Sequence, residues 1–240
     1  MTNKRTNRNN QLQSISPISE AHDHDIIVFT REIFLHGYGD GEEDAEVDYR
    51  SSSRFLKNLK ILESINNKPI TIHQYSIGGE WESGMMIYDA IQQSAASFIF
   101  ICHGIAASMG SITPQAAYNK GIRLTMPNCY WLIHEGEQAM SGTVKQFQSY
   151  YEFSRLSKFQ MYDIYTEVCH ESSTHFKNMT KSKTRNFIRR KLESKEDWWL
   201  VAEDAVKYGF RQSFFERGAI VIPNADAVKC GLDIVYLLFV

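Results

Sequence analysis

Ser108 lies in the stretch GIAASMGS (104–111), shortly after the apolar run SFIFIC (97–102). The apolar run predicts a buried strand, and the surrounding Gly and Ala residues predict a helix packed closely against it. A serine at such a strand-to-helix corner presents its hydroxyl where backbone N–H groups have no partner inside the helix. Its alternative role is that of a small residue at a close contact between helix and strand. The pattern therefore indicates a nucleophile only if a base and oxyanion donors lie nearby.

Two further strand ends can supply the base and the donors. Acyl transfer by serine requires a group that takes the hydroxyl proton and N–H groups that face the oxyanion. His134 follows the strand pattern CYWLI (129–133), and Gly79 comes shortly after the strand pattern PITIHQY (69–75). The amide of Met109 would point toward the site, and Gly79 has no side chain to block a close approach of its own amide. These residue types predict serine-based acyl transfer.

A metal site is not expected from the remaining histidines and cysteines. His170 and His175 in CHESSTH are five residues apart, whereas a metal-binding helix pair needs a spacing of four. The cysteines show no CxxC spacing, and two of them fall inside apolar runs, so we interpret them as reduced thiols of the core. They are Cys102, Cys129, Cys169 and Cys230.

The order of apolar patterns predicts an α/β domain with a largely parallel sheet. Strand-like and helix-like patterns alternate from residue 53 onward, and Pro114 should end or kink the helix that follows Ser108. In such a sheet the corners SIGG and HGIAAS should lie on the same edge, where α/β proteins bind ligands. The predicted helices cover 53–65, 83–95 and 141–170, and the predicted strands cover 69–75, 97–102, 122–126 and 129–133.

Composition favours one sizeable core and no specialised partner. The 240 residues carry 26 basic and 28 acidic side chains, for a formal charge of -2, which argues against a dedicated nucleic-acid surface. No run reaches the roughly 18 apolar residues that span a bilayer, and the N-terminus lacks the apolar segment of a secretory signal. A cytoplasmic location is therefore expected. Residues 1–24 predict a flexible polar arm, 37–53 an acidic loop, and 234–240 a strand.

Three motifs together resemble the proteolytic subunit of the Clp (caseinolytic) protease family. The nucleophile motif is similar to GIAASMG (104–110), the histidine motif to PNC through IH (127–134), and the oxyanion loop to SIGG (76–79). The resemblance runs from about residue 25 to 214. It implies a single domain with the Clp protease/crotonase-like fold of repeated β-β-α units, preceded by the arm 1–24 and followed by the C-terminal extension 215–240.

The resemblance also implies roles for individual residues. Ser108 would attack a peptide carbonyl, His134 would act as general base and then acid, and the amides of Gly79 and Met109 would hold the oxyanion. Counting back from WWLVAEDAVKYG (198–209) places Glu193 at the position where the family usually has an aspartate. Asp197, one helical turn further on, is the competing candidate for this third member.

Assembly and partners follow from the same resemblance. It implies polypeptide substrates, no cofactor, stacked heptameric rings joined through the long helix, and delivery by an AAA+ unfoldase. Ile77 replaces the usual proline before the glycine pair, and Glu135 and Gly136 replace a Gln-Pro pair after the histidine. These departures fit a divergent member, and also a phage-encoded one that processes capsid or scaffold proteins.

Three rival hypotheses remain at this stage. A catalytically silent ring subunit would keep the fold without the activity. A crotonase-type acyl-CoA enzyme would use paired carboxylates, for which no acid is suitably placed. A signal-peptide-peptidase-like enzyme would use a Ser-Lys dyad on a related fold, whereas the full histidine motif favours His134 as the base.

Overall fold

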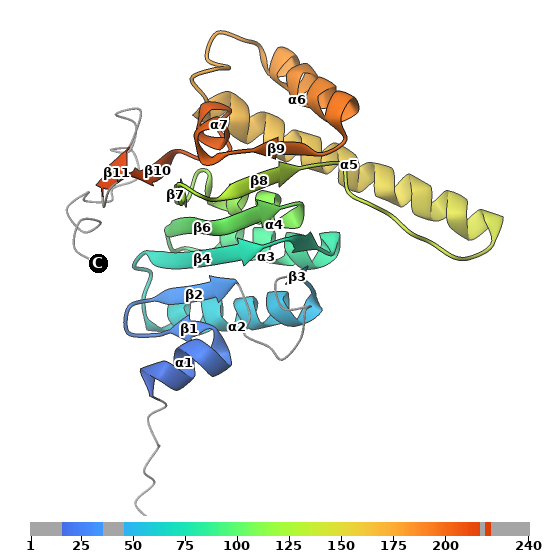
Figure 1. Cartoon of the computed structure of the whole chain (residues 1–240). Coiled ribbons are helices and arrows are strands. Elements are labelled where there is room, and N and C mark those ends of the chain that lie inside the picture. Colours follow the sequence, from blue (N-terminus) through green and yellow to red (C-terminus); the bar gives the residue numbers. More distant parts are fainter. Residues whose placement is uncertain (1–15, 36–45, 217–218, 222–240) are drawn as a thin grey trace, which may run out of the picture.

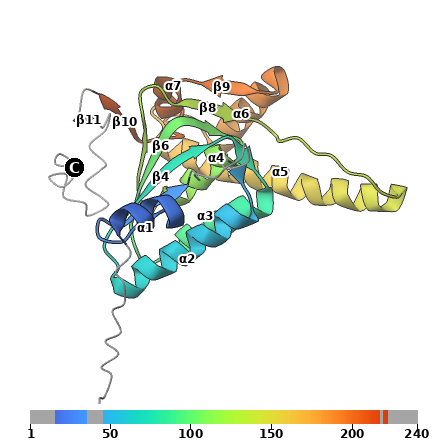
Figure 2. The same cartoon turned by 60° about the horizontal axis from the view of Figure 1, so that its bottom comes forward.

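The computed structural model describes residues 16–35, 46–216 and 219–221. A central sheet of mostly parallel strands runs in the order β1-β2-β4-β6-β7-β10-β11, and β8 and β9 continue it beside β6. Helices α2 and α3 cover one face of this sheet, while α5, α6 and α7 lie beyond its β8–β9 end (Figures 1 and 2). The predicted α/β class with a largely parallel sheet is confirmed.

The predicted alternation of helices and strands is also confirmed, with shifts of a few residues at the boundaries. The N-terminal elements are α1 (Pro17–His24), β1 (Ile26–Ile27), β2 (Glu32–Leu35), β3 (Glu46–Val47), α2 (Tyr49–Ile65), β4 (Ile70–Ser76), β5 (Gly78–Gly79) and α3 (Trp81–Gln93). The central ones are β6 (Phe98–Ala107), α4 (Met109–Ile112), the 3₁₀ helix η1 (Thr113–Ala117), β7 (Gly121–Thr125) and β8 (Tyr130–Ile133). The last are α5 (Val144–Ser172), α6 (Lys181–Lys195), β9 (Trp198–Leu200), α7 (Ala202–Lys207), β10 (Ser213–Glu216) and β11 (Ala219–Val221).

Strand β6 has two successive neighbours along one edge. Its first half, Phe98–Cys102, pairs in parallel with β7, and its second half, Ile105–Ala107, pairs in parallel with β8. On the other edge β6 pairs with β4, with Ser76 opposite Ala106. The two glycine-containing corners, SIGG after β4 and the turn after β6, therefore lie at the same end of the sheet, where the parallel strands β4 and β6 both end. The sequence predicts this placement.

Pro114 ends the short helix after Ser108, as predicted. Helix α4 spans only four residues, and the chain continues as the 3₁₀ helix η1 with Pro114 near its start. Proline has no N–H for an α-helical hydrogen bond, so the tighter turn follows naturally.

The two halves of α5 have different surroundings. Thr143 caps the helix through a reciprocal pair of hydrogen bonds with Gln146. Residues of the second half, such as Met161 and Tyr165, are buried, whereas the first half projects beyond the sheet (Figures 1 and 2). The helix thus anchors in the core at one end and exposes apolar side chains at the other.

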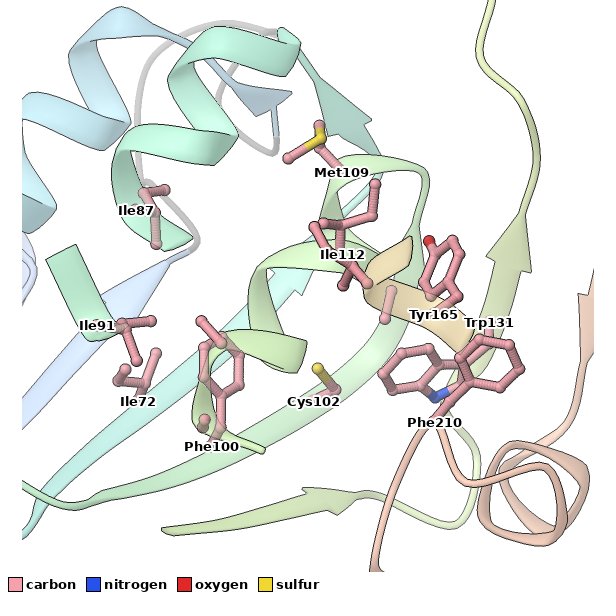
Figure 3. Close-up of a cluster of buried hydrophobic side chains, with 14 of the residues drawn as sticks. Ile72, Ile87, Ile91, Phe100, Cys102, Met109, Ile112, Trp131, Tyr165 and Phe210 are labelled. Atoms are coloured by element: carbon pink, nitrogen blue, oxygen red, sulfur yellow. The ribbon is translucent and has the colours of Figure 1, made fainter. Parts of the chain in front are cut away.

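The core gathers side chains from both the sheet and the helices on it. Figure 3 shows Phe100 and Cys102 of β6 between Ile72, Ile91 and the Trp131–Phe210 pair. The predicted core positions of three cysteines are confirmed, since Cys102, Cys129 and Cys169 are free and buried. Burial raises the pKa of Cys102 to about 12, so this thiol stays protonated at neutral pH. Cys230 lies outside the described residues.

The N-terminal arm differs from its prediction. Its last eight residues form α1, although their polar composition predicts a flexible segment. The side-chain amide of Asn58 donates a hydrogen bond to the carbonyl of His24 at 2.7 Å, and Arg54 forms an ion pair with Asp25. Asn58 and Arg54 lie on α2, so these contacts hold the end of α1 in place. The composition of residues 17–24 does not predict them, because the partners lie far away in the sequence.

Two other predicted segments are covered only in part. Residues 46–53 of the predicted acidic loop belong to β3 and to α2, which begins at Tyr49 after the N-cap Asp48. Residues 36–45, the predicted strand 234–240 and the first part of the arm, 1–15, lie outside the described residues. None of the helices in the described part of the chain is long and apolar enough to cross a bilayer.

An aromatic cluster joins the segment after α5 to α6, β9 and α7. Phe176 is fully buried, and its ring centroid lies 4.8 Å from that of His175, 5.2 Å from that of Phe187 and 6.2 Å from that of Tyr208. Trp198 completes the group against Tyr208 at 5.3 Å. The cluster holds the C-terminal elements onto the rest of the domain.

Replacing Phe176 by alanine should lower the free energy of unfolding by about 3–5 kcal/mol, because a fully buried ring leaves a cavity. Phe29→Ala is the matched control, since Phe29 is 93% exposed, and it should change the free energy by no more than about 0.5 kcal/mol. Urea denaturation followed by circular dichroism measures both values. Equal effects of the two substitutions would contradict the packing described here.

Candidate active site

Ser108 occupies a strained corner between β6 and α4. Its backbone has φ 51° and ψ -124°, a region that residues other than glycine rarely adopt. The Ser108 N–H donates to the carbonyl of Leu132 at 3.0 Å, and the Ser108 carbonyl accepts from the N–H of Ser111 at 2.8 Å. These backbone bonds hold the corner in place, and the serine side chain makes no capping bond to the helix.

The loop that contains the glycine pair passes directly beside this corner. A Cβ atom on Gly78 would lie 2.4 Å from the Cβ of Ser108, and Gly78 has φ +109°. Gly79 has φ +141°, and β5 pairs in parallel with β3, opposite Val47. Only glycine fits both the backbone conformation and the space at these two positions. The loop can therefore approach Ser108 closely enough for a backbone amide to serve it.

His134 follows β8 and faces a carboxylate. Its Nδ1 lies 3.5 Å from Oδ1 of Asp197, and its Nε2 is buried with no hydrogen-bond partner among the described residues. Asp197 is 53% exposed, whereas the His134 side chain is only 18% exposed. The imidazole thus has one nitrogen toward an acid and the other available for a proton.

The register of two strands explains this pairing. Strands β8 and β9 are antiparallel, with Ile133 opposite Trp198, so the residue after Ile133 and the residue before Trp198 are neighbours. Helix α6 ends at Lys195, and Glu196 turns the chain with φ 58°. This turn brings Asp197 into the ladder position next to His134.

Glu193, the first choice from the sequence for the third member, lies elsewhere. It sits on α6, more than half exposed, and its Oε1 is 3.6 Å from Nε of Arg189. The described residues show no ion pair between Glu193 and His134. The sequence left two candidates for the acid, and the structure brings Asp197 to the histidine. Glu193 lies on α6, which ends at Lys195, whereas Asp197 directly precedes β9, the strand that pairs with β8.

One pocket of about 310 Å³ brings the predicted site residues together. Gly79, Ser108, Met109 and His134 all line it, although they come from three separate stretches of sequence. The first half of α5 closes one side with Tyr150, among other residues. Asp197 stands behind His134 and does not line the pocket. The arrangement can hold a chain segment against the serine, with the histidine beside it.

A buried hydroxyl pair supports the corner from α5. The Ser111 hydroxyl donates to the carbonyl of Ser108 at 2.6 Å and contacts the Tyr165 hydroxyl at 2.6 Å, so the tyrosine must be the donor of that second bond. Burial raises the pKa of Tyr165 far above its ordinary value, which keeps the hydroxyl protonated. Sequence reasoning missed this pair, since the two residues are 54 positions apart.

The described residues hold no group of three or more histidine, cysteine, aspartate or glutamate side chains that could bind a metal ion. His170 Nδ1 lies 3.1 Å from the Thr184 hydroxyl, and His175 packs in the aromatic cluster. Both histidines of the CHESSTH stretch therefore make contacts within the fold, His170 with a threonine hydroxyl and His175 with aromatic rings.

A serine at a strand-to-helix corner of an α/β sheet, in one pocket with a histidine, is an arrangement that serine hydrolases use. The chain belongs to the Clp protease family, whose family model, described as Clp protease, matches residues 22–217. It is thus a member of a family of serine-type peptidases.

Two similar proteins agree with this membership, and one solved structure has a similar fold. The chain is 30% identical over 181 residues to the ATP-dependent Clp protease proteolytic subunit 2 of Treponema denticola, which covers 75% of this chain and 79% of the relative. It is 29% identical over 163 residues to the subunit of the same name from Pseudomonas aeruginosa, covering 68% and 74%. A mutant of ClpP1 from Listeria monocytogenes has a similar fold, with a TM-score of 0.61, 22% identity, and coverage of 84% of this chain and 96% of that one. The predicted Clp protease fold is confirmed.

Replacing Tyr165 by phenylalanine should lower the free energy of unfolding by about 1 kcal/mol, because one buried hydrogen bond is lost. Ser111→Ala should cost more, about 1–3 kcal/mol, because it leaves the tyrosine hydroxyl buried without a partner. The double variant should be more stable than the sum of the two losses predicts. Urea denaturation of all three, with the exposed Tyr151→Phe as control, measures this coupling; strict additivity would contradict it.

Proposed function

We propose that this protein is a serine endopeptidase in which Ser108, His134 and Asp197 form the catalytic triad. One observation carries the proposal: the β8–β9 ladder sets Asp197 beside the Nδ1 of a histidine that shares a pocket with Ser108. Asp197 here replaces Glu193 as the proposed acid. The amides of Gly79 and Met109 are proposed as the oxyanion donors.

The geometry supports a division of labour between the two nitrogens of His134. The carboxylate at Nδ1 favours the tautomer with a proton on that nitrogen, which leaves Nε2 as the base. Nε2 would take the Ser108 hydroxyl proton as the oxygen attacks the peptide carbonyl. It would then give that proton to the leaving amine, and a water activated in the same way would release the acyl group.

The glycine loop and the start of α4 suit the oxyanion that forms in this attack. Met109 is the first residue of α4, so its N–H has no partner inside the helix. Gly79 lines the same pocket and carries no side chain that could shield its amide. Backbone donors of this kind account for about 3 kcal/mol of transition-state stabilisation in serine peptidases. The proposed reaction uses neither a metal ion nor an organic cofactor.

We further propose that the chain assembles into stacked rings, with an AAA+ unfoldase that delivers polypeptide substrates. The relatives from Treponema denticola and Pseudomonas aeruginosa are named as subunits of ATP-dependent proteases. The projecting half of α5 supports assembly, because a row of large apolar side chains there is left exposed by the part of the chain that the structure describes. The row contains Val144, Phe147 and Leu156.

A fluorophosphonate probe should label the protein covalently at Ser108, because only an activated serine reacts with it. Ser108→Ala should abolish the adduct, and Ser64→Ala, which removes an exposed hydroxyl on α2 outside the pocket, should retain it. Intact-protein mass spectrometry counts the adducts. A folded wild-type protein that remains unlabelled would instead support the silent ring subunit.

The two carboxylates can be separated by a pair of isosteric substitutions. Asp197→Asn should lower kcat/KM for a fluorogenic peptide by at least about 100-fold, because the amide no longer favours the catalytic tautomer of His134. Glu193→Gln should change kcat/KM by less than about threefold, because the Glu193 carboxylate pairs with Arg189 and not with His134. Steady-state kinetics of both variants at equal oligomeric state measures this. The reverse ranking would identify Glu193 as the acid.

A further inference from the structure

We propose that the groove around Ser108 selects polypeptides by charge polarity. A basic substrate side chain would lie toward the start of α3, and an acidic one toward α6, on opposite sides of the scissile bond. This inference rests on the proposed endopeptidase function and adds the substrate class.

The catalytic pocket continues into a second hollow. This hollow, about 590 Å³, lies between α5 and α6. The chain after His134 and one turn of α5 line both spaces, so a bound peptide can pass from one to the other without leaving the surface. The residues that line both are Glu135, Gly136, Gln138, Ser154 and Lys158.

The α3 side of the groove is acidic. Glu80, Glu82 and Glu137 line the catalytic pocket, and none of the three forms an ion pair with a described residue. Glu80 accepts a hydrogen bond from the Ser83 hydroxyl at 2.7 Å, which orients its carboxylate at the start of α3. Glu80 and Glu82 therefore favour a cation at the start of α3, and Glu137, from the chain after His134, adds to the negative charge of the pocket.

The shared boundary is close to neutral because its charges are paired. Lys158 forms an ion pair with Glu135, and the Tyr162 hydroxyl donates to the same carboxylate at 2.5 Å. Burial alone would raise the pKa of Glu135, but the hydrogen bonds from Lys158 and Tyr162 hold it below its ordinary value. Glu135 therefore stays ionised and compensates Lys158, which separates the two halves of the groove.

The α6 side is basic. Arg155, Arg185 and Arg189 line the second hollow beyond Lys158, with Glu193 as the only carboxylate there besides Glu135. Arg185 pairs with Asp163 and Arg189 with Glu193, whereas the Arg155 guanidinium has no carboxylate partner among the described residues and lies over the Phe159 ring at 5.8 Å. The unpaired guanidinium of Arg155 therefore suits an acidic substrate side chain.

Helices α3 and α6 lie on opposite sides of β8 in the fold (Figure 1), so the acidic and basic halves flank the strand that ends at His134. A peptide that crosses from one half to the other passes the catalytic histidine. The order of the basic and acidic side chains along the peptide, rather than the net charge of the peptide, should then decide how well it binds.

Three internally quenched peptides test the polarity directly. Two of them have the same composition: one carries Lys on the N-terminal side and Glu on the C-terminal side of the cleaved bond, and the other carries them in reverse order. The third has Gln at both positions. We expect kcat/KM for the two charged peptides to differ by about threefold to fivefold, with the neutral peptide between them, as partly exposed ion pairs allow. The difference should disappear near 1 M salt, where the Debye length is about 3 Å.

A charge-reversal pair assigns the effect to the groove. Arg155→Glu should abolish or invert the preference between the two charged peptides. Arg190→Glu makes the same change of charge on α6 at a residue that lines neither of the two hollows, and it should leave the preference intact. Arg155 and Arg190 are both exposed, so neither change should unfold the protein.

The outcomes distinguish this inference from the function on which it rests. Equal rates for the two charged peptides, with Ser108 still labelled by the fluorophosphonate probe, would overturn the polarity and leave the peptidase standing. Equal effects of Arg155→Glu and Arg190→Glu would likewise overturn it. If none of the three peptides were cleaved and Ser108 stayed unlabelled, both the charge polarity and the peptidase function would be refuted.

Discussion

The division of β6 between two neighbours is the constraint on which the site depends. Because its first half pairs with β7 and its second half with β8, the strand continues beyond β7, and its last residue, Ala107, lies opposite Leu132 near the end of β8. Ser108 then follows the end of β6, and His134 follows the end of β8. Backbone hydrogen bonds of parallel and antiparallel pairs therefore position residues that are far apart in the sequence.

The corner at Ser108 shows how such a site tolerates local strain. A serine with a positive φ is unfavourable by itself, and it persists because the surrounding structure over-determines it. The Leu132 carbonyl, the Ser111 amide and the Ser111–Tyr165 hydroxyl pair each bind the backbone of this one residue or its immediate support. Gly78 contributes by leaving the space that a Cβ would occupy. Packing, rather than local preference, thus maintains the presentation of the hydroxyl.

Helix α5 connects this corner to the outer surface of the molecule. Its buried half brings Tyr165 against Ser111, and its projecting half lines the catalytic pocket and the neighbouring hollow. The charges that flank the groove come from α3, α5 and α6, so the same helices that complete the pocket also give it polarity.

The sequence by itself determined the elements and the family. Apolar periodicity predicted the strands and helices to within a few residues for most elements, and the motifs around Ser108, His134 and Gly79 carried the resemblance, because these signals are local. The carboxylate beside His134 was different. Counting along the chain favoured Glu193, but only the tertiary structure decided that Asp197 is its neighbour, since the end of α6, the turn at Glu196 and the register of β9 against β8 are set by contacts between distant segments. The Ser111–Tyr165 pair and the helix α1 were hidden for the same reason: their stabilising partners lie far away in sequence, and no local pattern records them.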